Sequence, residues 1–152
     1  MRVIDPKPPM AIVPILRAGL ALVEECASLL STARIYHVGY RRDEETHEAV
    51  CYLSGLPERL SPNMHILIPE PMLATGGTLL QVIDGLRNLG AEAKNIRVIS
   101  VIASEPALER IGAAYPELFI TCAAVDPQID ERCFIVPGLG DAGDRAFGTE
   151  DN

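Results

Sequence analysis

The chain has 152 residues, of which 48% are hydrophobic and 22% are charged, and its formal net charge is −8. This length and apolar content predict a single domain over residues 1–152 with its own core. The negative charge argues against a broad nucleic-acid or anionic-membrane surface. No apolar run approaches the roughly 20 residues of a membrane span, and no secretory signal is recognisable, so we expect a cytoplasmic protein.

Apolar runs of strand type alternate with helical patterns along the chain. The expected strands are Ala11–Leu16, Arg34–Tyr40, Met64–Ile68, Ile96–Ala103 and Leu118–Ala124. The expected helices are Ala18–Leu30, Leu79–Leu89 and Glu105–Ala114. This alternation predicts an α/β fold with a mostly parallel central sheet flanked by helices.

Two segments interrupt the alternation. Residues 41–63 combine a charged run with an alternating apolar piece, Ala49–Leu53, and with glycine and proline, which predicts a protruding surface arm that could be a hairpin. From Asp126 onward the sequence has little helical pattern and contains the glycine-rich run Pro137–Asp144. Such a run is typical of a loop.

The segment that follows the third expected strand has the pattern of a phosphate-binding turn. An acidic residue, Glu70, precedes the small-residue turn Ala74–Thr78, and an amphipathic helix follows. The two glycines of the turn let the backbone approach an anion and direct N–H groups at it, while its two threonines add hydroxyl donors. The first N–H groups of the helix would face the same point.

Two common nucleotide motifs do not fit this chain. The turn Ala74–Thr78 lacks the Gly-Lys-Ser/Thr ending of a P-loop. The segment Gly138–Gly143 matches Gly-x-Gly-x-x-Gly, but only nine residues follow it, which leaves no room for the helix and second strand of a dinucleotide-binding unit. We therefore expect neither site.

Four motifs in order carry a resemblance to a known family. They are Ile12-Val-Pro-Ile-Leu-Arg-Ala-Gly-Leu20, Tyr40-Arg-Arg-Asp-Glu-Glu-Thr46, Glu70-Pro-Met-Leu-Ala-Thr-Gly-Gly-Thr78 and Ile135-Val-Pro-Gly-Leu-Gly-Asp-Ala-Gly-Asp144, with Phe147-Gly-Thr after them. From about Ala11 to Thr149 the chain resembles the uracil phosphoribosyltransferases, a branch of the type I phosphoribosyltransferase fold. The resemblance implies transfer of the phosphoribosyl group of 5-phosphoribosyl diphosphate to uracil, giving UMP and diphosphate, with Mg²⁺ accompanying the sugar diphosphate.

The resemblance implies a donor site with Glu70 and Arg42 as its catalytic residues. Glu70 would accept hydrogen bonds from the ribose hydroxyls and stabilise positive charge at C1, and arginine offers diphosphate a planar fork of donors that stays charged. The uracil branch usually has Asp where this chain has Glu70, so its longer side chain could displace the carboxylate. The implied contacts to 5-phosphoribosyl diphosphate are Arg17, Arg42, Glu70, Pro71, Met72, Leu73, Ala74, Thr75, Gly76, Gly77, Thr78 and Asp141.

The resemblance also implies a base-binding loop at about residues 133–148. Contacts to uracil would come from Ile135, Gly140, Asp141 and Ala142. Backbone amides and carbonyls can match the oxygens and ring N–H of uracil, and they would reject the 4-amino group of cytosine. No direct metal ligand is expected, because Mg²⁺ would arrive with the substrate, near Asp141.

Family members carry a longer segment where this chain has only Met1–Met10 before the first motif. Two options are open: a shortened reading frame, or a natural short form whose apolar surface another chain covers. A catalytically weak nucleotide-sensing or regulatory module of the same fold is therefore an alternative function. We expect small-molecule substrates, a homo-oligomer, and no nucleic-acid or membrane partner, and we expect the four dispersed cysteines to be reduced packing residues.

Overall fold

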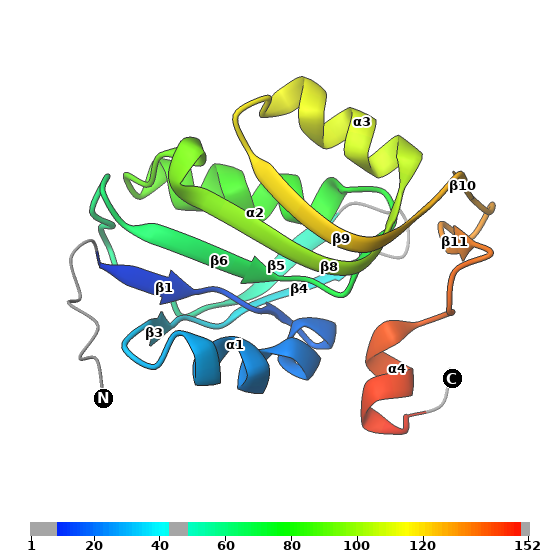
Figure 1. Cartoon of the computed structure of the whole chain (residues 1–152), viewed down its shortest axis with the longest axis horizontal. Coiled ribbons are helices and arrows are strands. Elements are labelled where there is room, and N and C mark those ends of the chain that lie inside the picture. The colour runs from blue at the N-terminus through cyan, green and yellow to red at the C-terminus, as the bar shows by residue number, and fades with distance from the viewer. Residues whose placement is uncertain (1–8, 43–48, 150–152) are drawn as a thin grey trace.

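The computed structural model describes residues 9–42 and 49–149, and it confirms the predicted α/β fold (Figure 1). The central sheet is built from β1 (Met10–Ile12), β3 (Arg34–Ile35), β6 (His65–Pro69), β7 (Met72–Leu73), β8 (Ile96–Ser104) and β9 (Phe119–Asp126). The order runs β3, β1, β6, β8, with β9 also paired to β8, and every pairing in this sheet is parallel.

Strands β6 and β7 pair with β8 in one continuous register. Ile66 pairs with Ile96 and Met72 pairs with Ile102, which is the same offset of 30 residues. The two residues between these strands, Glu70 and Pro71, are anchored to β8. The Glu70 N–H donates to the Ile99 carbonyl at 3.0 Å, and the Pro71 carbonyl accepts from the N–H groups of the two residues after Ser100, at 3.0 and 3.1 Å.

Helices cover the sheet on both sides (Figure 1). The helices α2 (Gly77–Asn88) and α3 (Glu105–Ala114) lie together on one side, and α1 (Val23–Leu29) lies on the other. The residues of α2 that are buried are spaced three or four apart, as an amphipathic helix requires: Leu79, Val82, Ile83 and Leu86. They form one core with buried residues of β6 and β8.

Several expected elements are divided in the structure. The expected strand Ala11–Leu16 is two strands, because the chain leaves the central sheet at Pro14, which has no N–H to donate. Its second half, β2 (Ile15–Leu16), pairs instead with β4 (Val38–Arg42) in a separate three-stranded sheet. The expected strand Arg34–Tyr40 divides in the same way into β3 and β4.

The expected helix Ala18–Leu30 begins with a tighter 3₁₀ segment, η1 (Ala18–Leu22), whose first bond runs from the Leu20 N–H to the Arg17 carbonyl at 3.1 Å. The α-helix proper is α1. A second short 3₁₀ segment, η2 (Ala93–Asn95), precedes β8.

The arm is a hairpin in its described part. Strand β4 pairs antiparallel with β5 (Ala49–Ser54), and the register shifts at Gly39/Tyr40. Residues 43–48 at the tip of the arm lie outside the described part of the chain.

The prediction of a loop for the C-terminal segment was incomplete. It contains an antiparallel pair, β10 (Gln128–Ile129) and β11 (Ile135–Val136), and a short helix, α4 (Ala142–Phe147). The Asp141 side chain caps α4 by accepting the Asp144 N–H at 2.8 Å. The glycine content hid this helix from a pattern-based prediction. Within residues 9–42 and 49–149, no helix is long and apolar enough to cross a membrane.

Candidate active site

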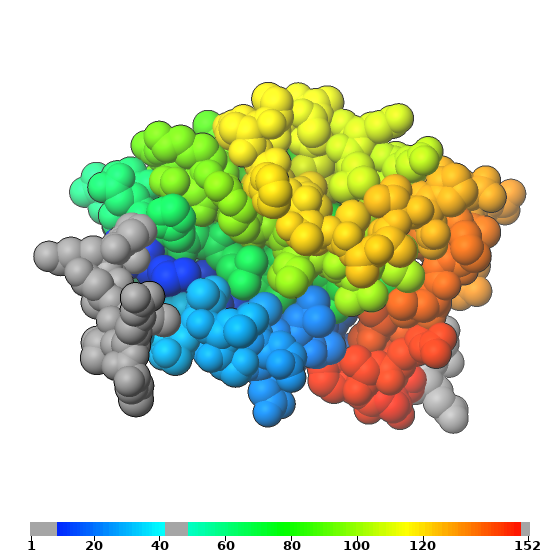
Figure 2. Space-filling model, in the orientation of Figure 1, coloured from blue at the N-terminus to red at the C-terminus, as the bar shows by residue number. Residues whose placement is uncertain are grey.

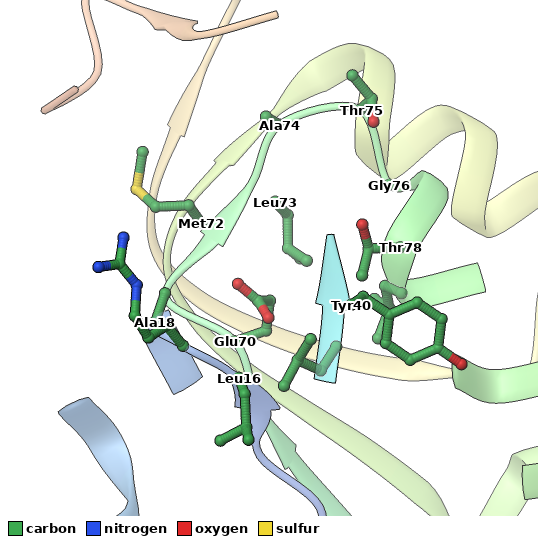
Figure 3. A pocket seen from close by; sticks show the side chains of 13 residues that line it. Leu16, Ala18, Tyr40, Glu70, Met72, Leu73, Ala74, Thr75, Gly76 and Thr78 are labelled. Carbon is green, nitrogen blue, oxygen red and sulfur yellow. The ribbon is translucent and has the colours of Figure 1, made fainter. Parts of the chain in front are cut away.

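A cavity of about 200 Å³ opens where strands of both sheets end beside the predicted phosphate turn (Figure 3). Its lining residues are Ile15, Leu16, Arg17, Ala18, Tyr40, Glu70, Met72, Leu73, Ala74, Thr75, Gly76, Thr78 and Leu79. Ligands of open parallel sheets bind outside the carboxyl ends of the strands, which is where this cavity lies.

The phosphate turn leads directly into α2. Gly76 has a φ of 72°, and a Cβ there would lie 3.0 Å from a side-chain carbon of Ile111, so the position requires glycine. The N-cap residue of α2, Gly76, has no side chain to cap the helix, and the first turn contains no acidic residue. The Gly77 N–H donates to Thr75 Oγ1 at 3.3 Å, and the positive end of the helix dipole meets no carboxylate of its own first turn, an arrangement that suits an anion.

Glu70 occupies the interruption between β6 and β7, and its carboxyl group points into the cavity (Figure 3). Burial among protein atoms raises the pKa of Glu70 to about 8, although a hydrogen bond from the Met72 N–H works in the opposite direction. Without ligand, the carboxyl group is therefore largely protonated at neutral pH. Positive charge placed beside it would favour the carboxylate.

The raised pKa of Glu70 predicts a pH-dependent stability. Between the ordinary value of 4.5 and about 8, the native state holds a proton that the unfolded state has lost, so stability falls as the pH rises through this window. We expect Glu70→Gln to match the parent near pH 5 and to exceed it at pH 8.5 by as much as a few kcal/mol in the free energy of unfolding.

Urea denaturation across this pH range measures the effect. Glu58→Gln, at an exposed glutamate, is the matched control and should leave the pH dependence unchanged. Parallel curves for the parent and Glu70→Gln would contradict the raised pKa.

A second cavity, of about 410 Å³, adjoins the first. It shares Ala18, Glu70, Met72, Ala74 and Thr78 with that cavity. The C-terminal segment supplies the rest of its lining: Arg132, Cys133, Phe134, Ile135, Gly140, Asp141, Ala142 and Gly143. The residues predicted for the donor and those predicted for the base therefore line neighbouring cavities that share Glu70, and we call these the donor-side cavity and the base-side cavity.

The base-side loop is shaped by close backbone contacts. Gly138 has a φ of 54°, and a Cβ there would lie 2.1 Å from the Ile135 carbonyl oxygen. Asp126, at the end of β9, accepts the Gly138 N–H at 2.9 Å. These contacts fix the path of the loop that brings Gly140 and Asp141 to the cavity.

Arg17 connects the first motif to the C-terminal segment. Its guanidinium Nη2 lies 2.6 Å from Asp144 Oδ1, and its Nη1 donates to Thr149 Oγ1 at 3.0 Å. The Arg17 side chain is 51% exposed, so it remains accessible to an anion in the cavity. The sequence did not predict this ion pair.

The two cavities bring together most of the residues that the sequence assigned to donor and base. Pro71 and Gly77 do not line either cavity: Pro71 is buried, and Gly77 begins α2 and donates its N–H to Thr75 Oγ1 at 3.3 Å. Arg42 ends β4, but its side chain lies outside the described part of the chain, so its contact with diphosphate stays a prediction.

Sequence reasoning missed Tyr40 and the base-side residues Arg132, Cys133 and Phe134. Burial and the neighbouring Cys51 raise the pKa of Tyr40 to about 12, so its hydroxyl stays protonated. Tyr40 directly precedes Arg41 and Arg42 in the sequence, and this was the one local indication that it lies near the site. All four cysteines are free, as expected, but Cys51 is exposed and Cys133 lines the base-side cavity, so the expectation of packing residues is wrong for these two.

Solved structures share this fold. The AQ2163 protein of Aquifex aeolicus matches with a TM-score of 0.83 and 34% identity, covering 94% of this chain and 67% of that one. An APRTase of Giardia lamblia matches with a TM-score of 0.62 and 23% identity, covering 78% and 71% of the two chains. The fold is that of the type I phosphoribosyltransferases.

The sequence comparisons are more specific. The family model "Uracil phosphoribosyltransferase" matches residues 2–149. The uracil phosphoribosyltransferase of Synechococcus elongatus is 55% identical over 146 residues, covering 96% of this chain and 67% of that protein, and the chloroplastic one of Arabidopsis thaliana is 46% identical over 147 residues, covering 97% and 50%. The chain belongs to the uracil phosphoribosyltransferase family, and it spans between half and about two thirds of the length of these relatives.

Proposed function

We propose that this protein transfers the phosphoribosyl group of 5-phosphoribosyl diphosphate to uracil, giving UMP and diphosphate. The observation that carries the proposal is that the cavity at the phosphate turn and the cavity at the C-terminal segment adjoin and share Glu70 in their lining. A substrate pair bound in these compartments would place the sugar C1 beside Glu70, between the base and the departing diphosphate.

The chemistry of each compartment suits one part of this reaction. The turn Ala74–Thr78 offers N–H and hydroxyl donors to the 5-phosphate, and Arg17, which lines the same cavity, would bind the diphosphate. The bond from N1 of uracil to C1 forms as the bond from C1 to the diphosphate oxygen breaks, diphosphate leaves with the electron pair of that bond, and the N1 proton is released to solvent. Glu70 as a carboxylate would stabilise the positive charge that develops on the sugar.

We propose that Mg²⁺ enters with the diphosphate and that Asp141 lies beside it. Among the described residues, no three His, Cys, Asp or Glu side chains form a group that could hold a metal ion. Two carboxyl groups, Glu70 and Asp141, line the base-side cavity. One or two carboxylates with substrate phosphates and waters are the usual ligands of Mg²⁺, so the donor set fits. The ion would neutralise charge on the diphosphate.

Incubation with 5-phosphoribosyl diphosphate, Mg²⁺ and uracil tests the proposal, with UMP measured by chromatography. We expect UMP with uracil, much less without Mg²⁺, and no CMP when cytosine replaces uracil, because the amino group would meet a backbone donor. A reaction without base is the control. Binding of 5-phosphoribosyl diphosphate with no UMP above that control would contradict the transfer reaction and favour a nucleotide-sensing module.

A homo-oligomer and a cytoplasmic location complete the proposal, and both stay predictions. Exposed apolar side chains on β9, Phe119 at 60% and Val125 at 48%, support self-association.

A further inference from the structure

Two consecutive carbonyl groups of the phosphate turn are held from outside the cavity. The Ala74 carbonyl accepts a hydrogen bond from Ser104 Oγ at 2.6 Å, and the Thr75 carbonyl accepts one from Arg110 Nη1 at 3.3 Å. Ser104 is the last residue of β8 and is completely buried, whereas Arg110 is exposed on α3. Neither residue lines either cavity.

These hydrogen bonds fix the direction of the N–H groups on the other side of the turn. In a trans peptide the N–H points opposite to the C=O of the same peptide plane, and cis bonds in the described chain occur only at Leu16–Arg17 and Val136–Pro137. With the carbonyls of Ala74 and Thr75 directed at Ser104 and Arg110, the N–H groups of Thr75 and Gly76 are directed away from α3. Ala74, Thr75 and Gly76 all line the donor-side cavity (Figure 3).

We propose that Ser104 and Arg110 are positioning residues for the 5-phosphate of the donor, because they lock two peptide planes so that their N–H groups face the cavity. The inference rests on the proposed function, which places that phosphate in the turn. A peptide plane free to rotate could turn its carbonyl oxygen, with its partial negative charge, toward the phosphate. Donors that are oriented before the ligand arrives bind it without paying for that reorganisation.

A structural role for Ser104 alone is the competing explanation. Its hydroxyl oxygen also accepts the Ala107 N–H at 3.1 Å and so caps α3. Ser104→Gly removes both hydrogen bonds, but glycine at an N-cap costs only a few tenths of a kcal/mol relative to serine, so the loss of the cap changes helix stability little. The main effect of Ser104→Gly is therefore the loss of the hydrogen bond to the Ala74 carbonyl. Ser104→Thr keeps a hydroxyl and so keeps both bonds.

Steady-state kinetics and product inhibition test the proposal. We expect Ser104→Gly to raise KM for 5-phosphoribosyl diphosphate about 5- to 10-fold and Arg110→Gln about 2- to 3-fold, from the loss of one hydrogen bond each. The dissociation constant of UMP should rise with KM, since UMP carries the same phosphate. We expect changes of less than twofold in KM for uracil, in kcat and in the inhibition constant of diphosphate. Ser104→Thr should have the same values as the parent.

Arg97→Gln is the matched control for Arg110→Gln. Arg97 also donates to backbone carbonyls, those of Lys94 and Ile96, but it lies at the opposite end of β8. We expect its KM values to be parental. An unchanged KM for 5-phosphoribosyl diphosphate in Ser104→Gly, or an equal loss for all ligands, would overturn the proposal.

The inference can fail separately from the proposed function. If the parent forms no UMP, the proposed transfer reaction is refuted. Titration calorimetry still gives the dissociation constant of ribose 5-phosphate, whose phosphate would bind at the phosphate turn. Weaker binding by Ser104→Gly than by the parent would then support the positioning role, and equal binding would refute it.

Discussion

Replacement of Arg17 by alanine is expected to lower kcat/KM for 5-phosphoribosyl diphosphate by about 10²- to 10³-fold, a loss typical of removing one donor that stabilises developing charge. Arg17 lines the donor-side cavity, and its side chain is half exposed. It would bind the diphosphate more strongly as its charge increases on departure, so kcat should fall as well as KM rise. Initial rates over a range of donor concentrations give both constants.

The controls for Arg17→Ala must separate the effect of lost diphosphate binding from the effect of the lost ion pair with Asp144 in α4. Asp144→Asn weakens the ion pair while leaving the guanidinium in place, so it should cost much less activity. Arg34→Ala, at an exposed arginine on β3, should have no effect. A parental kcat/KM for Arg17→Ala would exclude Arg17 from the donor site, and an equal loss for Asp144→Asn would assign its role to the ion pair.

Replacement of Glu70 by glutamine is expected to lower kcat by about 10²-fold, because an amide cannot stabilise positive charge on the sugar as a carboxylate does. The parent should also show a kcat/KM that rises with pH as the free enzyme loses the Glu70 proton, with an apparent pKa near 8. Glu70→Gln should lose this rise. Rates from pH 6 to 9 with both proteins measure it.

Two variants complete this experiment. Glu70→Asp, which keeps the carboxylate and shortens the side chain by one methylene, should keep most of kcat, and Glu58→Gln should match the parent at every pH. A parental kcat for Glu70→Gln would show that Glu70 is not a catalytic residue.

Local signals account for the parts of the fold that the sequence predicted well. Helix α3 begins and ends where expected, because Ser104 caps it, Pro106 suits its first turn and the apolar spacing continues to Ala114. The phosphate turn was predictable for the same reason: its glycines, its threonines and the helix after it are adjacent in the chain.

The rest depends on contacts between distant segments. The ion pair of Arg17 with Asp144 joins residues 127 positions apart, and Arg110 reaches the turn from 35 positions away. The division of the first expected strand depends on pairing with β4, since the apolar pattern of Ala11–Leu16 is continuous except for its proline. No local pattern carries such information.

The common offset of β6 and β7 along β8 sets how far Glu70 extends into the active site. Both strands and both residues between them are attached to β8, so the backbone at Glu70 has no slack in either direction. A change in side-chain length at position 70 therefore moves the carboxyl group within the cavity, because the backbone cannot shift to absorb it, and the hydrogen bond from the Met72 N–H restrains that group further. An inserted or deleted residue here would move the carboxyl group to the other face of the sheet. Strand β8 thus fixes the backbone position of residue 70, and the depth that its carboxyl group reaches is set by the length of the side chain.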